Sequence, residues 1–160
     1  PQVVLGVAQA VAPIGAWLAV TGEFGGPVDA WPALWLGLGV GCWIGGFDLI
    51  YACQDAEVDR AIGVRSVPAR FGVAGALRAS RVTHVVTFLF FVLFGVTVDA
   101  TGWWYAGLAL TAIAFVFEHR MVSADDLSRV NRAFFTVNGF IGLALLAFGV
   151  ADLVARGLGV

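Results

Sequence analysis

Residues 32–51 read PALWLGLGVGCWIGGFDLIY and contain a single charged side chain, Asp48. A helix of about 20 residues rises about 30 Å, which is the thickness of the hydrocarbon core of a lipid bilayer. Pro32 stands at the start of the run, where a helix tolerates proline because its first N–H groups have no partner within the helix. This stretch therefore predicts a membrane-spanning helix.

Four more apolar runs surround this one, and together they decide the fold class. We place them at residues 2–20, 82–98, 103–117 and 133–152. Over the whole chain 60% of residues are hydrophobic and only 12% are charged, whereas a soluble domain carries about 25% charged residues. A secretory signal peptide does not explain the first run, because no basic region precedes it and the pattern repeats. We expect an all-α, polytopic membrane helix bundle with five transmembrane helices, and we treat residues 1–160 as one domain.

The basic residues indicate how the bundle is oriented. All nine are arginines, and eight of them lie in residues 52–81 and 118–132, two connections that five spans place on the same side. The connections 21–31 and 99–102 contain none, and the tail contains only Arg156. Basic residues in short loops near span ends favour the cytoplasmic side. We therefore expect an integral membrane protein whose loop at 52–81 lies in the cytoplasm.

Four acids gather where the second apolar run ends. If the helix continues past the membrane surface, Asp48, Tyr51, Asp55 and Asp59 fall at i, i+3, i+7 and i+11 and form one stripe, whereas Glu57 points elsewhere. Two carboxylates at i and i+4 on a helix repel each other, so a cation is expected between them. Mg²⁺ suits this position, because it prefers oxygen ligands, takes one or two carboxylates and bridges to substrate phosphates.

Arginines follow these acids within a few residues. Arg60, Arg65 and Arg70 offer donors that suit phosphate oxygens, so the segment is typical of a metal–diphosphate site. The alternative is a solvated loop with weak surface ion pairs. Asp48 favours the site, because an ionisable residue inside an apolar segment is costly and indicates a function. Asn138 in the last run is a weaker candidate, since a hydrogen bond between helices explains it equally well.

The remaining metal-binding residue types have simpler interpretations. Cys42 and Cys53 lie eleven residues apart along one apolar segment and its exit, which suits buried free thiols better than a disulfide or a metal site. His84 and His119 have no partner at a metal-ligand spacing, so we expect both to be interface or bundle residues.

At these residues the sequence resembles the UbiA family of membrane prenyltransferases, whose second aspartate-rich motif reads approximately Y/F-D-x-x-Y-A-x-x-D-x-x-x-D-x-x-x-G-[KR]-S. Nine positions agree when one residue is allowed before the basic position: Phe47, Asp48, Tyr51, Ala52, Asp55, Asp59, Gly63, Arg65 and Ser66. The segments GAWLAVTG (15–22), PARFG (68–72) and NRAFFTVNGFIG (131–142) resemble the 4-hydroxybenzoate polyprenyltransferase-like branch, which prenylates aromatic acids in quinone biosynthesis.

This resemblance implies a nine-helix bundle with a central cavity, in which the five predicted spans correspond to the fifth through ninth helices. In the family, two aspartate-rich motifs hold Mg²⁺ on the diphosphate of a polyprenyl donor. The prenyl group then separates from the diphosphate as an allylic cation that attacks an aromatic ring carbon. The implied partners are a polyprenyl diphosphate, an aromatic acid and membrane lipid, but no nucleic acid. Carried over by position, the implied site comprises metal ligands Asp55 and Asp59, cavity residues Asp48 and Tyr51, and substrate-binding residues Arg65, Arg60 and Asn138.

One part of the family pattern has no counterpart. The first motif, N-D-x-x-D, does not occur, because the sequence contains no Asn-Asp pair. We expect the chain to be a truncated form of an enzyme and to be inactive alone. The expected enzyme transfers a polyprenyl group to a hydroxybenzoate or hydroxynaphthoate for ubiquinone or menaquinone synthesis, in a bacterial inner or plasma membrane. A non-enzymatic membrane module, such as a divalent-cation carrier or an assembly subunit, is the alternative, although acids clustered at one mouth favour the enzyme.

Overall fold

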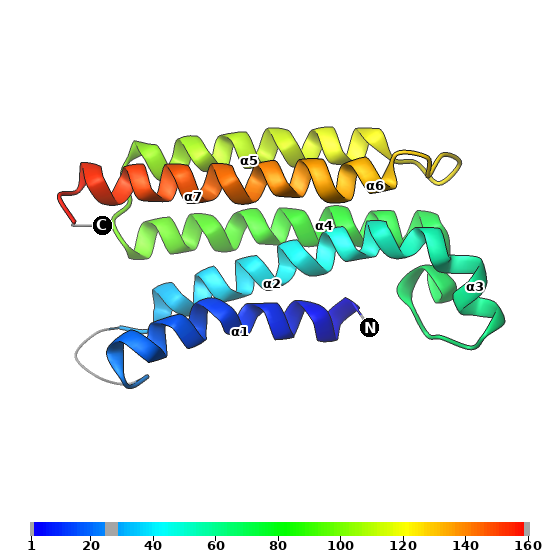
Figure 1. Cartoon of the computed structure of the whole chain (residues 1–160), viewed down its shortest axis with the longest axis horizontal. Coiled ribbons are helices and arrows are strands. Elements are labelled where there is room, and N and C mark those ends of the chain that lie inside the picture. The colour runs from blue at the N-terminus through cyan, green and yellow to red at the C-terminus, as the bar shows by residue number, and fades with distance from the viewer. Residues whose placement is uncertain (1, 25–28, 159–160) are drawn as a thin grey trace.

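The computed structural model describes residues 2–24 and 29–158, in which long antiparallel helices lie side by side (Figure 1). Every regular element in these residues is helical, so the predicted all-α class is confirmed. The elements are α1 (Gln2–Thr21), α2 (Trp31–Tyr51), η1 (Ala52–Asp55), α3 (Ala56–Ala61), α4 (Val67–Thr97), α5 (Gly102–Met121), α6 (Val130–Arg132), the π-helix η2 (Ala133–Val137) and α7 (Asn138–Ala155).

The predicted spans 2–20, 32–51, 103–117 and 133–152 each coincide with a helical stretch to within a few residues. Among the residues that the structure describes, four helical stretches are long and apolar enough to cross a membrane: Gln2–Thr21, Trp31–Ala61, Val67–Thr97 and Val130–Ala155. The predicted span 103–117 lies within α5, which has the same length as α1 but ends in Glu118, His119 and Arg120 and is not one of these four. The protein is therefore an all-α membrane bundle.

The third predicted span differs most from the structure. Helix α4 begins at Val67, whereas residues 52–81 were expected to form a loop. Ser66 has extended backbone angles and its hydroxyl accepts a hydrogen bond from the Ala69 N–H, and proline follows in the first turn, so the local sequence starts a helix here. Gly72, with φ 74°, then bends the chain before the long apolar part begins. Arginine has a high helix propensity, so the basic residues at 70–81 are compatible with a helix. Their charge indicates where the apolar span begins but does not predict a loop.

Helices α1 and α2 approach each other backbone to backbone. A Cβ atom added to Gly6 would lie 2.7 Å from the carbonyl oxygen of Gly41, and one added to Gly41 would lie 2.6 Å from that of Gly6. A Cβ atom added to Gly37 would likewise lie 2.6 Å from the carbonyl oxygen of Ala10. Small residues allow this approach, which membrane helices use because hydrocarbon gives them little hydrophobic reason to associate.

We expect Gly41→Ala to destabilise the bundle by about 1–3 kcal/mol, because its methyl group overlaps a carbonyl oxygen and forces α1 away from α2. Gly15→Ala on α1 is the matched control, since its Cβ meets nothing within 4 Å. Thermal unfolding of the purified protein in detergent, followed by circular dichroism, measures the difference. Equal midpoints for the two variants would show that this contact is not close in solution.

The two arginine-bearing connections lie at the same end of the bundle. The α2–α4 connection with α3, and the α5–α6 connection, both extend beyond the helices at this end, whereas the C-terminus lies at the other (Figure 1). We call this the arginine-bearing end. It is the arrangement that the distribution of arginines predicted, and it carries the aspartate-rich segment.

Candidate active site

The aspartate-rich segment continues α2 beyond Tyr51 through a tighter turn. Residues Ala52–Asp55 form the 3₁₀-helix η1, and Ala56–Ala61 form α3. A 3₁₀-helix turns about 20° more per residue than an α-helix, so four residues rotate the following side chains by about 80°. Asp55 and Asp59 are therefore rotated relative to Asp48, compared with the positions that a continuous α-helix would give them. Asp48 is half-buried and has Gln2 of α1 as a neighbour.

The Asp55 and Asp59 carboxylates are not used by the fold. Asp55 occupies the N-cap position of α3, where aspartate commonly accepts a backbone hydrogen bond, yet its side chain makes no capping bond. Neither residue takes part in the two ion pairs found in residues 2–24 and 29–158. Asp55 is exposed and Asp59 is half-buried, so both oxygen pairs are available to a ligand.

The three arginines predicted to contact phosphate line one pocket. Arg60, Arg65 and Arg70 surround a space of about 380 Å³ at the turn between α3 and α4. The turn depends on Gly63, whose φ of 78° is in the left-handed region that favours glycine. The Nε of Arg60 donates to the Ala69 carbonyl oxygen at 3.3 Å, which orients that side chain. The structure thus brings these cations together directly after the acids.

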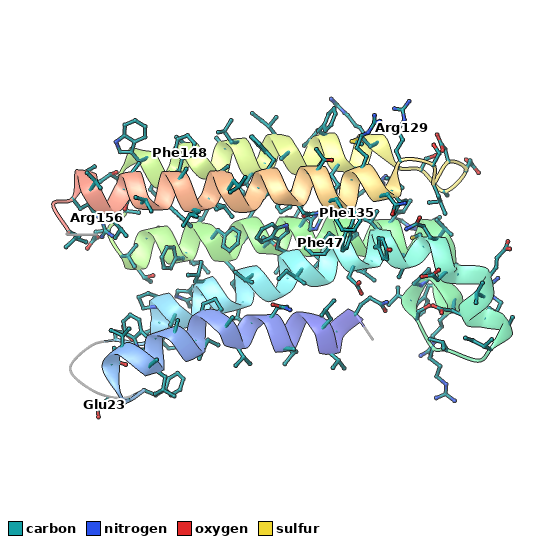
Figure 2. All side chains as sticks on the ribbon, viewed as in Figure 1. Glu23, Phe47, Arg129, Phe135, Phe148 and Arg156 are labelled. Carbon is teal, nitrogen blue, oxygen red and sulfur yellow. The ribbon has the colours of Figure 1, made fainter. Side chains whose placement is uncertain are left out.

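An aromatic row extends along α2 from Tyr51 toward the middle of the bundle. We define it as Trp43, Phe47, Tyr51 and Phe134. The Phe134 ring of η2 lies 4.9 Å from Phe47 and 4.4 Å from Tyr51, measured between ring centroids. Figure 2 shows Phe47, near Phe135 of η2, between the middle of the bundle and the arginine-bearing end, where Arg129 lies. Phe134 belongs to the short π-helix η2, and single-turn π-helices are frequent at functional sites.

A buried polar network lies behind the aromatic row and connects α2, α4, α5 and α7. We define it as Trp43, His84, Glu118, His119 and Asn138. The Trp43 indole N–H donates to Asn138 Oδ1 at 2.7 Å, and Asn138 Nδ2 donates to Glu118 Oε1 at 3.0 Å. His84 Nδ1 lies 3.6 Å from Glu118 Oε2 and 3.0 Å from His119 Nε2. Each of these five residues thus has a polar neighbour on another helix, although His84 Nε2 and Glu118 Oε2 make no hydrogen bond within the described residues.

This network tests several sequence-based interpretations. Asn138 is buried and makes a hydrogen bond between helices, which was the alternative to substrate binding. The two histidines are bundle residues, as expected, and the two cysteines are free. Glu118 was missed, although it is fully buried. The rule applied to Asp48, an ionisable side chain at an apolar helix, would have found it if the predicted span had not ended at residue 117.

The acids fit a magnesium site with few protein ligands. No group of three or more His, Cys, Asp or Glu side chains that could hold a metal occurs among the described residues. Mg²⁺ does not need one, because it retains waters and binds through one or two carboxylates and substrate phosphates. Residues one helical turn apart have Cβ atoms about 5–6 Å apart, which suits Asp55 and Asp59 for sharing one ion.

The comparison against known families agrees with the family that the motif indicates. Residues 1–150 match the model of the UbiA prenyltransferase family. The chain belongs to this family. It is similar to the 4-hydroxybenzoate octaprenyltransferases of Pseudomonas aeruginosa strain UCBPP-PA14 (35% identity over 98% of this chain and 50% of the relative) and of Chromohalobacter salexigens (32%, over 94% and 48%).

A more distant relative of the same description comes from Francisella tularensis subsp. novicida, with 27% identity over 96% of this chain and 52% of the relative. The chain therefore spans about half the length of the curated relatives that it matches. No solved structure gives a significant match.

Proposed function

We propose that this chain forms part of a Mg²⁺-dependent prenyltransferase that moves a polyprenyl group from its diphosphate to an aromatic acid, a hydroxybenzoate or hydroxynaphthoate. The product would serve ubiquinone or menaquinone biosynthesis. The observation that carries the proposal is the pocket lined by Arg60, Arg65 and Arg70, which directly follows the free carboxylates of Asp55 and Asp59. Membership of the family and the names of the relatives support the same reaction.

The charges of the segment explain how it would bind a diphosphate. The carboxylates of Asp55 and Asp59 would by themselves repel the donor, so they act as ligands of Mg²⁺, which when bound offsets negative charge on the leaving diphosphate. The guanidinium groups of Arg60 and Arg65 donate paired hydrogen bonds to phosphate oxygens. These guanidinium groups line one pocket before the donor binds, so they would stabilise the charge that gathers as the carbon–oxygen bond breaks.

The aromatic row supplies the apolar part of the site. Its rings present π faces along α2, and such faces attract a cation near the ring. We propose that the row shields the allylic cation from water, with Tyr51 nearest the diphosphate and Asp48 at the edge of the cavity. Asn138 would act on the substrate through Trp43, whose indole N–H it holds at 2.7 Å.

The acids of this chain supply one half of a two-sided metal site, and its arginines indicate how the protein lies in the membrane. The UbiA motif pattern pairs the present acids with an N-D-x-x-D segment, so we propose that residues 1–160 alone are inactive. We also propose that the arginine-bearing end faces the cytoplasm of a bacterial inner or plasma membrane, because eight of nine arginines lie there.

A transfer assay tests the function. Membranes containing the protein expressed from its complete coding sequence are incubated with a polyprenyl diphosphate and either 4-hydroxybenzoate or a hydroxynaphthoate. We expect chromatography to detect a prenylated acid that forms with Mg²⁺ and disappears with EDTA. No product with either acceptor contradicts the proposal, and Mg²⁺ uptake into sealed vesicles without product would instead support a cation carrier.

A further inference from the structure

A second pocket lies between α4 and α5, separate from the aspartate-rich segment. It encloses about 500 Å³ and is lined by one stripe on each helix, from Arg81 to Leu89 on α4 and from Ala112 to Arg120 on α5. Most of its wall is apolar, and Val85 and Leu89 are 61% and 56% exposed. The Phe115 ring stacks on His84 at 4.1 Å between ring centroids, and His84 and His119 line the pocket where it meets the buried polar network.

The two antiparallel helices place both arginines of this pocket at one mouth. Arg81 lies at the start of its stripe and Arg120 at the end of the other, so both face the arginine-bearing end. Both side chains are exposed, and neither takes part in the ion pairs found in residues 2–24 and 29–158. Two guanidinium groups over an apolar groove require an anion with an apolar tail.

We propose that this pocket binds one acidic phospholipid, with its phosphodiester between Arg81 and Arg120 and an acyl chain along the apolar stripes. Basic pockets between transmembrane helices recognise acidic headgroups, and arginine suits phosphate because its donors form a planar fork. The nine residues from Arg81 to Leu89 span eight helical steps, about 12 Å, which accommodates part of one acyl chain.

The composition of the pocket distinguishes this lipid from the prenyl donor. No carboxylate lines the pocket, so it lacks the Mg²⁺ ligands that a diphosphate would require. Two arginines offset a singly charged phosphodiester well. The pocket is therefore a lipid site that acts independently of the diphosphate site at residues 55–70.

Native mass spectrometry of the protein purified in mild detergent tests the proposal, using phosphatidylglycerol and phosphatidylcholine as probes. We expect preferential retention of phosphatidylglycerol, and we expect the double variant Arg81→Gln/Arg120→Gln to lower it about tenfold. The matched control Arg78→Gln/Arg129→Gln removes two exposed arginines at the same end that do not line the pocket. It should retain the lipid like the wild type.

A second variant tests the apolar part with both arginines present. Val85→Trp fills the pocket and should also lower phosphatidylglycerol retention, while circular dichroism confirms that helicity is unchanged. If the two double variants lost phosphatidylglycerol retention equally, the lipid would be attracted to basic residues in general, and the proposal would be overturned. Retention that is equal for the two lipids, or unaffected by Val85→Trp, would overturn it as well.

Discussion

Replacing Asp55 or Asp59 by asparagine is expected to lower the rate of Mg²⁺-dependent prenyl transfer by about 100-fold or more. Asparagine keeps the size of the side chain but removes the negative charge that a hard divalent cation favours. Loss of one group that stabilises transition-state charge typically costs about 10²–10³ in rate. The measurement is the initial rate in membranes from the complete coding sequence at saturating substrates, with Mg²⁺ varied.

Glu57→Gln provides the matched control for this experiment. Glu57 lies between the two aspartates in the sequence and is exposed, and its carboxylate likewise takes no part in the ion pairs of the described residues. We expect it to keep wild-type activity, because it does not share the turn that joins Asp55 and Asp59. Wild-type turnover by both aspartate variants, or an equal loss in Glu57→Gln at the same protein level, would disprove the metal assignment.

The helical path of the aspartate-rich segment and the clustering of its arginines could be predicted from sequence because they depend on neighbouring residues, whereas binding of a metal stays a prediction. Residues 47–66 follow the family motif in register, and η1, which ends at Asp55, and α3, which carries Asp59, follow α2 without an intervening loop. The gathering of Arg60, Arg65 and Arg70 around one pocket also follows from neighbouring positions and a glycine turn at residue 63. Such features depend on contacts within about twenty residues, which a single sequence displays.

Other features depend on partners far away in the sequence and were not predicted. Asp152 lies near the end of the last span, where the sequence shows no reason for a charged residue. In the structure it accepts hydrogen bonds from the Thr101 N–H at 2.6 Å and from the Thr101 hydroxyl at 2.7 Å, and it forms an ion pair with Arg156 at 3.0 Å. Glu118 likewise gains its partners only when α5 and α7 meet. The 3₁₀ turn at η1, which rotates Asp55 and Asp59 relative to Asp48, has no local signal that we recognise.

Asn138→Leu is expected to destabilise the bundle by about 1–3 kcal/mol. Leucine is similar in size but leaves the Trp43 indole N–H without its acceptor and Glu118 Oε1 without its donor. A hydrogen bond between membrane helices contributes about 0.6 kcal/mol on average and up to about 1.7, and an unsatisfied buried group adds to the loss. Unfolding of the purified protein in mixed detergent micelles measures the change. Asn131→Leu is the control, because Asn131 is exposed.

A double-mutant cycle identifies the cause of this loss. Glu118→Leu alone leaves the Asn138 amide without its carboxylate partner, whereas Asn138→Leu/Glu118→Leu removes both ends of the 3.0 Å bond together. Because apolar replacement of both partners leaves neither end of this bond orphaned, although the Trp43 indole N–H still lacks its acceptor, we expect the double variant to lose less than the sum of the single losses. Additive losses would show that Asn138 and Glu118 contribute separately. Asn138 would then stabilise the bundle through Trp43, and Glu118 through His84.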